Sequence, residues 1–361
     1  MFFITNKKKR KMVMINKKIV SSIFGIILII VLSSCNSQSV DNRAKESETD
    51  IFAMDTYMSL KAYGENSEKV LQKTSDKIKD LDEMLSVINE KSEIFKLNNA
   101  NGEQIKISSD TALLINRSIE INKDTNGAFD ITLYPITKEW GFTTGNYKVP
   151  TQARIDELLK YVGSEKIILD NDNNLVSLNN HANIDLGGIA KGYAGRCAAD
   201  IIKSEGITSA ILNMGGNVQT IGAKPDGNNW KIGIQDPNDS SDIVGIVEVA
   251  DKAVITSGGY ERYFEDENGN IYRHIIDPKT GYPAETDIIS VTVIGSDGMT
   301  CDALSTSLFV MGIEKSVEYI GTKHDYDVII VSSDNKIYIT SGIAEKFTVS
   351  SKFSEYTLNT I

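Results

Sequence analysis

A carboxylate and a hydroxyl lie four residues apart at the start of an apolar stretch. They are Asp302 and Thr306, in the segment Thr-Cys-Asp-Ala-Leu-Ser-Thr that begins at Thr300. Residues at this spacing share one face of a helix, and hard oxygen ligands so arranged suit Mg²⁺. The same residues also suit a helix start, with Thr300 as N-cap and Asp302 complementing the helix dipole. Both interpretations stay open on these residues alone.

A glycine pair marks a second candidate site. Asp185 precedes Gly187 and Gly188, which open a segment with helical periodicity. Glycines at a helix entry let a ligand approach backbone amides closely, or they allow tight packing against a sheet. Lys191 falls in the first turn of this helix, where the helix dipole disfavours a cation. An anionic partner, such as a diphosphate or a nearby carboxylate, would explain that position.

His274 is the candidate for proton transfer. Of the three histidines, it alone lies among ionisable and turn residues, between Arg273 and Asp277. A histidine in such surroundings can act as a general base, or it can be a hydrogen-bonded structural residue at the end of a strand. No serine nucleophile elbow, P-loop, dinucleotide-binding glycine motif or cysteine-rich metal spacing occurs. Serine hydrolase, NTPase, Rossmann and zinc interpretations therefore have no support.

Aromatic residues stand near a glycine-containing segment at residues 127–133. Phe129 and Trp140 could clamp a flat ring system, but for each one separately a place in the core is the better explanation. Cys197 and Cys301 lie in apolar helical patterns, so we expect two buried thiols rather than a disulfide.

The N-terminus resembles a bacterial lipoprotein signal. Residues 1–34 hold seven of the Lys and Arg residues and no acidic residue, and they include a short apolar run that ends at a small-residue box before Cys35. We expect Cys35 to be lipidated and the protein to be anchored on the extracytoplasmic face of the cell membrane. A retained anchor helix is the alternative, and either Met1 or Met14 could be the start. The remaining chain has 31 basic and 49 acidic side chains, a formal charge of −18, which argues against nucleic-acid binding.

We expect one large α+β domain at residues 51–346, after a flexible polar tether at residues 35–50 and before a polar tail at residues 347–361. Short β-rich runs joined by Asn-, Asp- and Gly-rich links favour mostly antiparallel sheets flanked by helices. Helical periodicity predicts helices at residues 67–85, 110–123, 151–162, 189–203 and 300–311.

Several segments together resemble the ApbE-like FAD:protein FMN transferases. They are residues 54–57, 127–135, 184–192, 213–217, 273–283 and 290–312, in the expected order. The resemblance implies Mg²⁺ ligands at the Gly188 carbonyl, the Asp302 carboxylate and the Thr306 hydroxyl. It also implies FAD contacts at Met54, Ala128, Phe129, Asp130, Asp185, Lys191 and near Ile276.

The implied reaction moves FMN from FAD onto a Thr or Ser hydroxyl of an acceptor flavoprotein, such as a subunit of a membrane redox complex, and releases AMP. His274 would deprotonate the acceptor hydroxyl, with Asp277 able to share that role. Asp55 replaces a commoner glycine, and Ile88 replaces an aromatic residue that often stacks near the ligand. The second change leaves open the balance between transfer and hydrolysis. Two rival functions remain: a Mg²⁺-dependent FAD diphosphatase and a non-catalytic flavin-binding lipoprotein.

Overall fold

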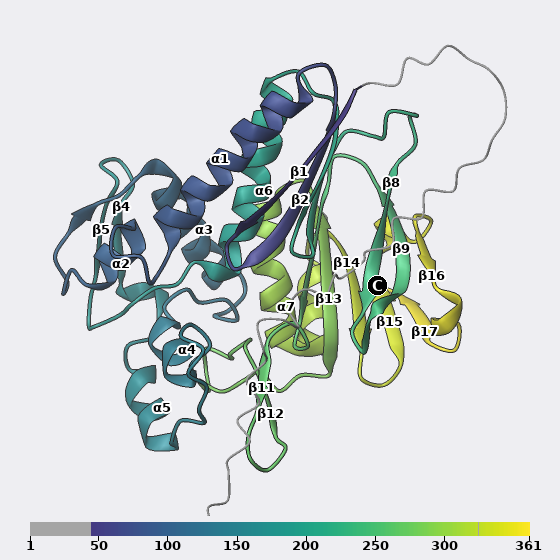
Figure 1. Cartoon of the computed structure of the whole chain (residues 1–361). Coiled ribbons are helices and arrows are strands. Elements are labelled where there is room, and N and C mark those ends of the chain that lie inside the picture. The colour runs from purple at the N-terminus through teal and green to yellow at the C-terminus, as the bar shows by residue number, and fades with distance from the viewer. Residues whose placement is uncertain (1–44, 324) are drawn as a thin grey trace, which may run out of the picture.

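The computed structural model describes residues 45–361 except residue 324. Its centre is a nine-stranded sheet in the order β1-β2-β6-β7-β10-β13-β14-β15-β17, antiparallel throughout except for the last pair (Figure 1). The strands are β1 (Glu46–Ala53), β2 (Thr56–Tyr63), β6 (Ser209–Met214), β7 (Asn217–Ile221), β10 (Ala253–Gly258), β13 (Ile288–Gly295), β14 (Asp327–Ser332), β15 (Lys336–Ile339) and β17 (Thr357–Thr360).

Helices cover one face of this sheet, and a smaller sheet covers part of the other (Figure 1). The covering helices are α1 (Ser67–Leu85), α6 (Gly187–Ser204) and α7 (Gly298–Ile320), with α3 (Ser109–Asp124) beside them. The smaller sheet has the order β16-β9-β8. Its strands are β16 (Phe347–Val349), β9 (Asp239–Val249) and β8 (Trp230–Asp236). This layering explains why the central strand β13 is buried almost throughout, whereas β2 alternates between buried and half-buried residues.

Smaller elements complete the fold. They are α2 (Glu93–Asn98), α4 (Tyr134–Trp140), α5 (Gln152–Leu159), a sheet of β3 (Ile105–Lys106), β5 (Leu175–Leu178) and β4 (Ile167–Asp170), and the hairpin β11 (Tyr263–Glu265) and β12 (Ile271–Arg273). No helix in the described part of the chain is both long and apolar enough to span a membrane.

The predicted α+β class with mostly antiparallel sheets is confirmed, and each of the five predicted helices is present. Two expected boundaries are wrong. Residues 46–50, placed in the tether, pair with β2 as part of β1. The tail beyond residue 346 belongs to the fold: β16 pairs with β9, β17 pairs with β15, and Phe347 and Phe353 are buried in the core beneath the small sheet. The expected signal and Cys35 lie outside the described residues.

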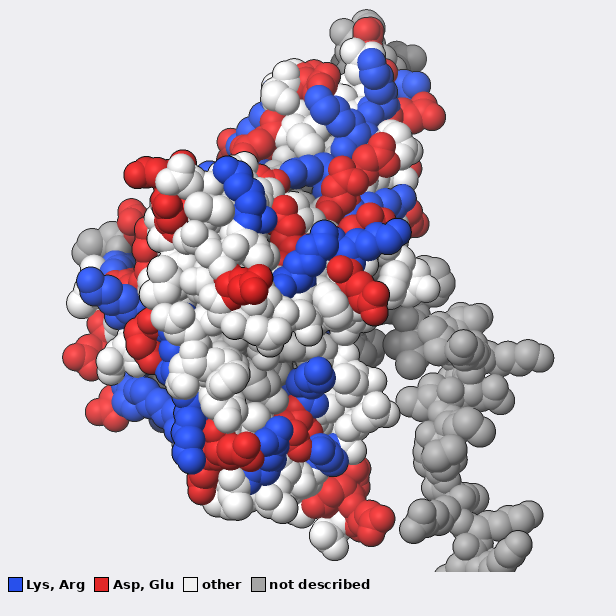
Figure 2. All heavy atoms as spheres, turned by 90° about the vertical axis from the view of Figure 1, so that its left-hand side faces the viewer, with Lys and Arg blue, Asp and Glu red and all other residues white. Residues whose placement is uncertain are grey.

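Acidic and basic side chains are interspersed over the face seen in Figure 2 rather than gathered in patches of one sign. No basic patch of the kind that nucleic-acid binding uses is seen on this face of the described residues. Both cysteines of the described part are free thiols, Cys301 buried and Cys197 half-buried, so the expectation of thiols rather than a disulfide is confirmed.

Candidate active site

A single large cleft collects almost all of the candidate residues. Its volume is about 3390 Å³, and it is open to solvent, so it can admit a ligand larger than the small molecules that usually fill pockets of roughly 300–1,000 Å³. The candidates that line it are Met54, Ala128, Phe129, Asp130, Asp185, Gly188, Lys191, His274, Ile276, Asp302 and Thr306. Met54 and Thr306, which are 252 positions apart in the sequence (306 − 54), thus line one cleft.

Asp302 is a buried carboxylate held by two neutral donors. The backbone N–H of Gly192 donates to its Oδ2 at 2.8 Å, and the side-chain amide of Asn217 donates to its Oδ1 at 3.2 Å. Only 6% of the residue is exposed. Burial raises the pKa of Asp302, while the positive charge of Lys191 and these two hydrogen bonds oppose the rise. A cation in the cleft would stabilise the charged form of this carboxylate.

The two other expected Mg²⁺ ligands face the same cleft. Thr306 lies one helical turn beyond Asp302 on α7, and its Oγ1 is 3.4 Å from Oγ of Ser257. Gly188 lies in the first turn of α6, where a Cβ would come within 2.9 Å of the Phe129 ring. A glycine is therefore needed at position 188 for space, because the aromatic ring occupies the volume of a side chain.

The oxygen donors of this group suit a hard cation. A carboxylate, a hydroxyl and a backbone carbonyl are the ligand types that Mg²⁺ takes in proteins, usually with several waters retained. Among the described residues there is no group of three or more His, Cys, Asp or Glu residues able to hold a metal. A cation here would therefore depend on the one buried carboxylate of Asp302 and on neutral oxygens.

His274 follows β12 and is half-buried in the wall of the cleft. Its Nδ1 lies 3.1 Å from the carbonyl oxygen of Arg262. A carbonyl only accepts hydrogen bonds, so Nδ1 carries the proton and Nε2 keeps its lone pair. Burial and the positive charges of Arg262 and Lys191 lower the pKa of His274 to about 4. The ring is therefore neutral near physiological pH, as a general base must be.

Asp277 does not belong to this group. It is absent from the lining of the cleft, and its Oδ1 accepts a hydrogen bond of 2.9 Å from the backbone N–H of Lys279. The carboxylate thus closes its own turn, a common use of Asp in loops. Its suggested role as a helper of His274 therefore stays a prediction.

Two of the expected flavin-contact carboxylates have local structural partners. Asp130 accepts hydrogen bonds from the backbone N–H and the hydroxyl of Thr132 and from the Asn122 amide. Asp185 accepts one from the backbone N–H of Gly187, at the start of α6. Burial raises the pKa of both carboxyl groups. These bonds fix the two loops that form this wall of the cleft.

The turn between β1 and β2 explains one departure from the family pattern. Met54 and Asp55 both have positive φ, 50° and 58°, in a two-residue hairpin turn that favours glycine or a short polar residue. Aspartate tolerates this conformation better than most residues, so it can replace glycine here. Ile88 also lines the cleft and is 67% exposed, so an aromatic ring at this position would face the open space of the cleft.

The aromatic residues divide between core and cleft. Trp140 is fully buried, and its indole N–H donates to the Gly281 carbonyl at 2.9 Å. Phe129 is also buried, but it lines the cleft. The expectation of a core position is thus met fully by Trp140, whereas Phe129 serves both the core and the cleft wall. Phe142, next to Trp140, also reaches the cleft.

Sequence reasoning missed Asn217 and Arg262. Asn217 follows a Gly215-Gly216 turn at positive φ and donates to Asp302. Arg262 fixes the tautomer of His274 through its carbonyl, and its guanidinium donates to the Phe142 carbonyl at 2.8 Å. The Asn-Met-Gly-Gly-Asn segment at residues 213–217 could have indicated Asn217, because a Gly-Gly pair predicts a tight turn and the residues beside such a turn are often in a functional site. No local pattern distinguished Arg262 from other surface arginines.

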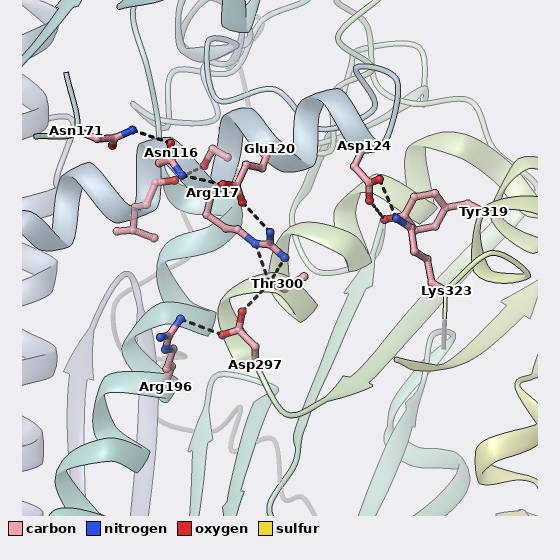
Figure 3. Close-up of polar contacts among 12 residues, drawn as sticks. Asn116, Arg117, Glu120, Asp124, Asn171, Arg196, Asp297, Thr300, Tyr319 and Lys323 are labelled. Atoms are coloured by element: carbon pink, nitrogen blue, oxygen red, sulfur yellow. Dashed lines mark hydrogen bonds and ion pairs between the residues drawn. The ribbon is translucent and has the colours of Figure 1, made fainter. Parts of the chain in front are cut away.

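A second polar group lies where α7 begins (Figure 3), and its residues are not among those that line the cleft. Arg117 of α3 donates from Nε and Nη2 to the Thr300 hydroxyl at 3.1 and 3.0 Å. That hydroxyl donates to Oδ2 of Asp297 at 2.6 Å, and Arg196 of α6 lies 3.6 Å from Oδ1 of Asp297. Thr300 is therefore an internal residue of the first turn, and Asp297 precedes the helix as its N-cap residue.

Known proteins share both the sequence and the fold. The ApbE family model matches residues 54–330. The FAD:protein FMN transferase of Haemophilus influenzae is 30% identical over 342 residues, which cover 91% of this chain and 98% of that protein. A Klebsiella pneumoniae protein of the same name is 32% identical over 78% of this chain and 88% of its own.

Two solved structures are similar over most of the chain. The ApbE protein of Thermotoga maritima matches with a TM-score of 0.76 and 34% identity, covering 86% of this chain and 99% of that one. The flavin transferase ApbE from Vibrio cholerae matches with a TM-score of 0.73 and 27% identity, covering 87% and 99%.

Proposed function

Because the chain belongs to the ApbE family, we propose that it is an FAD:protein FMN transferase whose reaction takes place in the cleft lined by the N-terminal parts of α6 and α7. The observation that carries the assignment to this cleft is the convergence of Asp302 and His274 on one space. The first is a buried carboxylate with only neutral donors, and the second is a histidine with a free Nε2. A ligand-binding protein without catalysis needs no such proton acceptor.

The residues of the cleft fit a cation-dependent transfer. Asp302, Thr306 and the Gly188 carbonyl would hold Mg²⁺, which when bound would neutralise diphosphate charge and ease the departure of AMP. Lys191 lines the cleft and supplies a positive charge near Asp302 and His274. The protein is strongly acidic, so these local cations are needed to accept an anionic dinucleotide.

His274 would act on the acceptor. Its Nε2 takes the proton of a Thr or Ser hydroxyl, and the resulting oxygen attacks the FMN-side phosphorus of FAD. The bond from that phosphorus to the bridging oxygen breaks, so the acceptor gains FMN as a phosphoester and AMP leaves with the bridging oxygen. The Arg262 carbonyl keeps Nδ1 protonated and so holds Nε2 in the accepting form.

Incubation with FAD, Mg²⁺ and a candidate acceptor flavoprotein tests this function against its two rivals. Intact-mass analysis of the acceptor and chromatography of the nucleotides are read together. A transferase yields an FMN adduct and an equal amount of AMP. A diphosphatase yields AMP and free FMN without adduct, and a binding protein yields neither. Either of the last two results would overturn the proposal.

The location is a separate proposal that rests on the sequence alone. The basic start, the short apolar run and the box before Cys35 support a lipid anchor on the extracytoplasmic face, where a membrane-bound redox protein could be the acceptor. Cys35→Ser should release the protein from the membrane fraction and remove the lipid mass. If the variant stays with the membrane and keeps that mass, the lipid-anchor proposal fails.

A further inference from the structure

The start of α7 is held from the side facing α3 by a paired donor. Arg117 donates two hydrogen bonds to one acceptor, the hydroxyl of Thr300, which is only 2% exposed. The guanidinium reaches this hydroxyl while Nη1 is fixed at 2.8 Å by Glu120 on its own helix (Figure 3). Arginine provides such a planar fork of donors, whereas lysine provides a single point of charge.

The opposite side of the same helical turn carries the expected cation ligand. Thr300 and Asp302 are two residues apart, and each residue advances a helix by about 100°, so their side chains point to nearly opposite sides. Asp302 is held on its side by Gly192 of α6 and Asn217 of β7. The first turn of α7 is therefore fixed from both sides. Arg117 holds one side, and Gly192 and Asn217 hold the other.

The same contacts set the spacing between α6 and α7. A Cβ on Gly192 would lie 2.1 Å from the Gly298 carbonyl oxygen, so the two helices touch backbone to backbone. Arg196 of α6 lies 3.6 Å from Asp297, which also accepts the Thr300 hydroxyl's hydrogen bond. Arg117 thus holds Thr300 directly and, through it, a residue that is paired with α6.

We propose that Arg117 is a positioning residue for the cation site, because it fixes the rotation and depth of the first turn of α7 relative to α6. That turn carries Asp302 and leads to Thr306, whereas Gly188 is carried by α6. Any rotation of α7 therefore moves two of the three expected ligands away from the third. This inference rests on the proposed function, since it concerns the Mg²⁺ site described there.

A second contact between α3 and α7 provides a matched control. Asp124, at the end of α3, accepts hydrogen bonds from Tyr319 at 2.5 Å and Lys323 at 2.8 Å, near the far end of α7 (Figure 3). Gly312 interrupts α7 between the two contacts with φ 76° and ψ 174°. Loss of the Asp124 contact should therefore loosen the same pair of helices without rotating the turn that carries Asp302.

The test is a calorimetric titration of Mn²⁺ into the flavin-free protein, together with the Mg²⁺ concentration needed for half-maximal AMP release and the midpoint of thermal unfolding. Arg117→Lys keeps the charge but not the fork. Thr300→Val removes the acceptor, and Thr300→Ser keeps it. The double variant Arg117→Lys with Thr300→Val and the control Asp124→Asn complete the set.

We expect Arg117→Lys and Thr300→Val each to weaken metal binding about tenfold, the low end for residues that hold a metal ligand in place. Thr300→Ser should bind as the wild type does. The double variant should be no weaker than the single ones, since both remove one contact. Asp124→Asn should lower the unfolding midpoint without changing the metal affinity.

Two results would contradict the inference in distinguishable ways. If the wild type binds Mn²⁺, Asp302→Ala abolishes binding, and Arg117→Lys and Thr300→Val bind like the wild type, then Arg117 does not position the site although the site exists. If Asp302→Ala binds Mn²⁺ as the wild type does, the cation site itself is wrong, and the positioning role falls with it.

Discussion

The backbone N–H of Gly192 donates a 2.8 Å hydrogen bond to Oδ2 of Asp302, and this contact joins α6 to α7 at one of the expected cation ligands. It is possible only because residue 192 is glycine. A Cβ there would lie 2.7 Å from the Asp302 Cβ as well as against the backbone of Gly298. Helix spacing and the position of the carboxylate therefore depend on the same residue.

Gly192→Ala should force the two helices apart and lower the free energy of unfolding by about 1–3 kcal/mol, as overpacking of a close contact usually does. Gly195→Ala, one turn later on α6, is the matched control. Its Cβ would meet Met214 at 3.4 Å, an ordinary contact, so the gain in helix propensity should make it neutral or slightly stabilising. Urea unfolding of both variants measures the difference. Equal effects at the two positions would show that helix spacing does not depend on Gly192.

Asp302→Asn should abolish FAD-dependent AMP release while the thermal unfolding midpoint changes little. The substitution relieves a buried charge and also removes one of the two hydrogen bonds from Gly192 and Asn217, so its effects on stability have opposite signs. A parallel measurement of AMP release and of the unfolding midpoint checks this. If the variant keeps wild-type activity at limiting Mg²⁺, then Asp302 is not a metal ligand.

Ile88→Tyr should tighten FAD binding. The side chain at position 88 is exposed at the cleft, and a stacked aromatic pair contributes about 0.5–1.5 kcal/mol, which corresponds to roughly 2- to 12-fold in affinity. Quenching of flavin fluorescence gives the dissociation constants. Ile88→Leu, which adds no ring, should leave the affinity unchanged. If both variants gain affinity equally, or if Ile88→Tyr gains none, then the side chain at position 88 does not contact FAD.

The lowered pKa of His274 predicts a pH-dependent stability. The pKa is about 4 in the folded protein and 6.5 ordinarily, so the neutral ring contributes stability that is fully present above the unfolded value. That contribution is lost as the pH falls from 6.5 through 4. His274→Gln should therefore lose less unfolding free energy than the wild type between about pH 7 and pH 4. His181→Gln, at an exposed site, is the control. Equal losses in wild type and His274→Gln would contradict the assignment.

Local patterns predicted the parts of the site that a single element carries. The spacing of Asp302 and Thr306 implied one face of a helix, and Gly188 and Lys191 followed from a glycine-marked helix start. Whether Asp277 would face the cleft could not be predicted, because that depends on the turn its own carboxylate forms with Lys279. The residue type and the sequence neighbours of Asp277 fit a catalytic role and a structural role equally well.

Contacts distant in sequence account for the parts of the fold that were missed. Phe347 pairs with Val247 across about a hundred residues, so nothing near residue 347 marked it as a strand. Strand β1 was taken for tether because its first residues, from Glu46 onward, are polar and alternate between exposed and half-buried at a sheet edge. Arg262 acts through its backbone carbonyl, which no side-chain pattern can indicate.

The central claim is that His274 activates the acceptor hydroxyl in this cleft, and the rate of FMN attachment in the His274→Gln variant tests it most directly. The measurement is a time course of acceptor intact mass at saturating FAD and Mg²⁺, with FAD affinity determined separately. The account predicts transfer slower by about 10²–10⁴-fold, the usual contribution of a general base, with FAD binding unchanged. Transfer at the wild-type rate by a variant that binds FAD normally would contradict it.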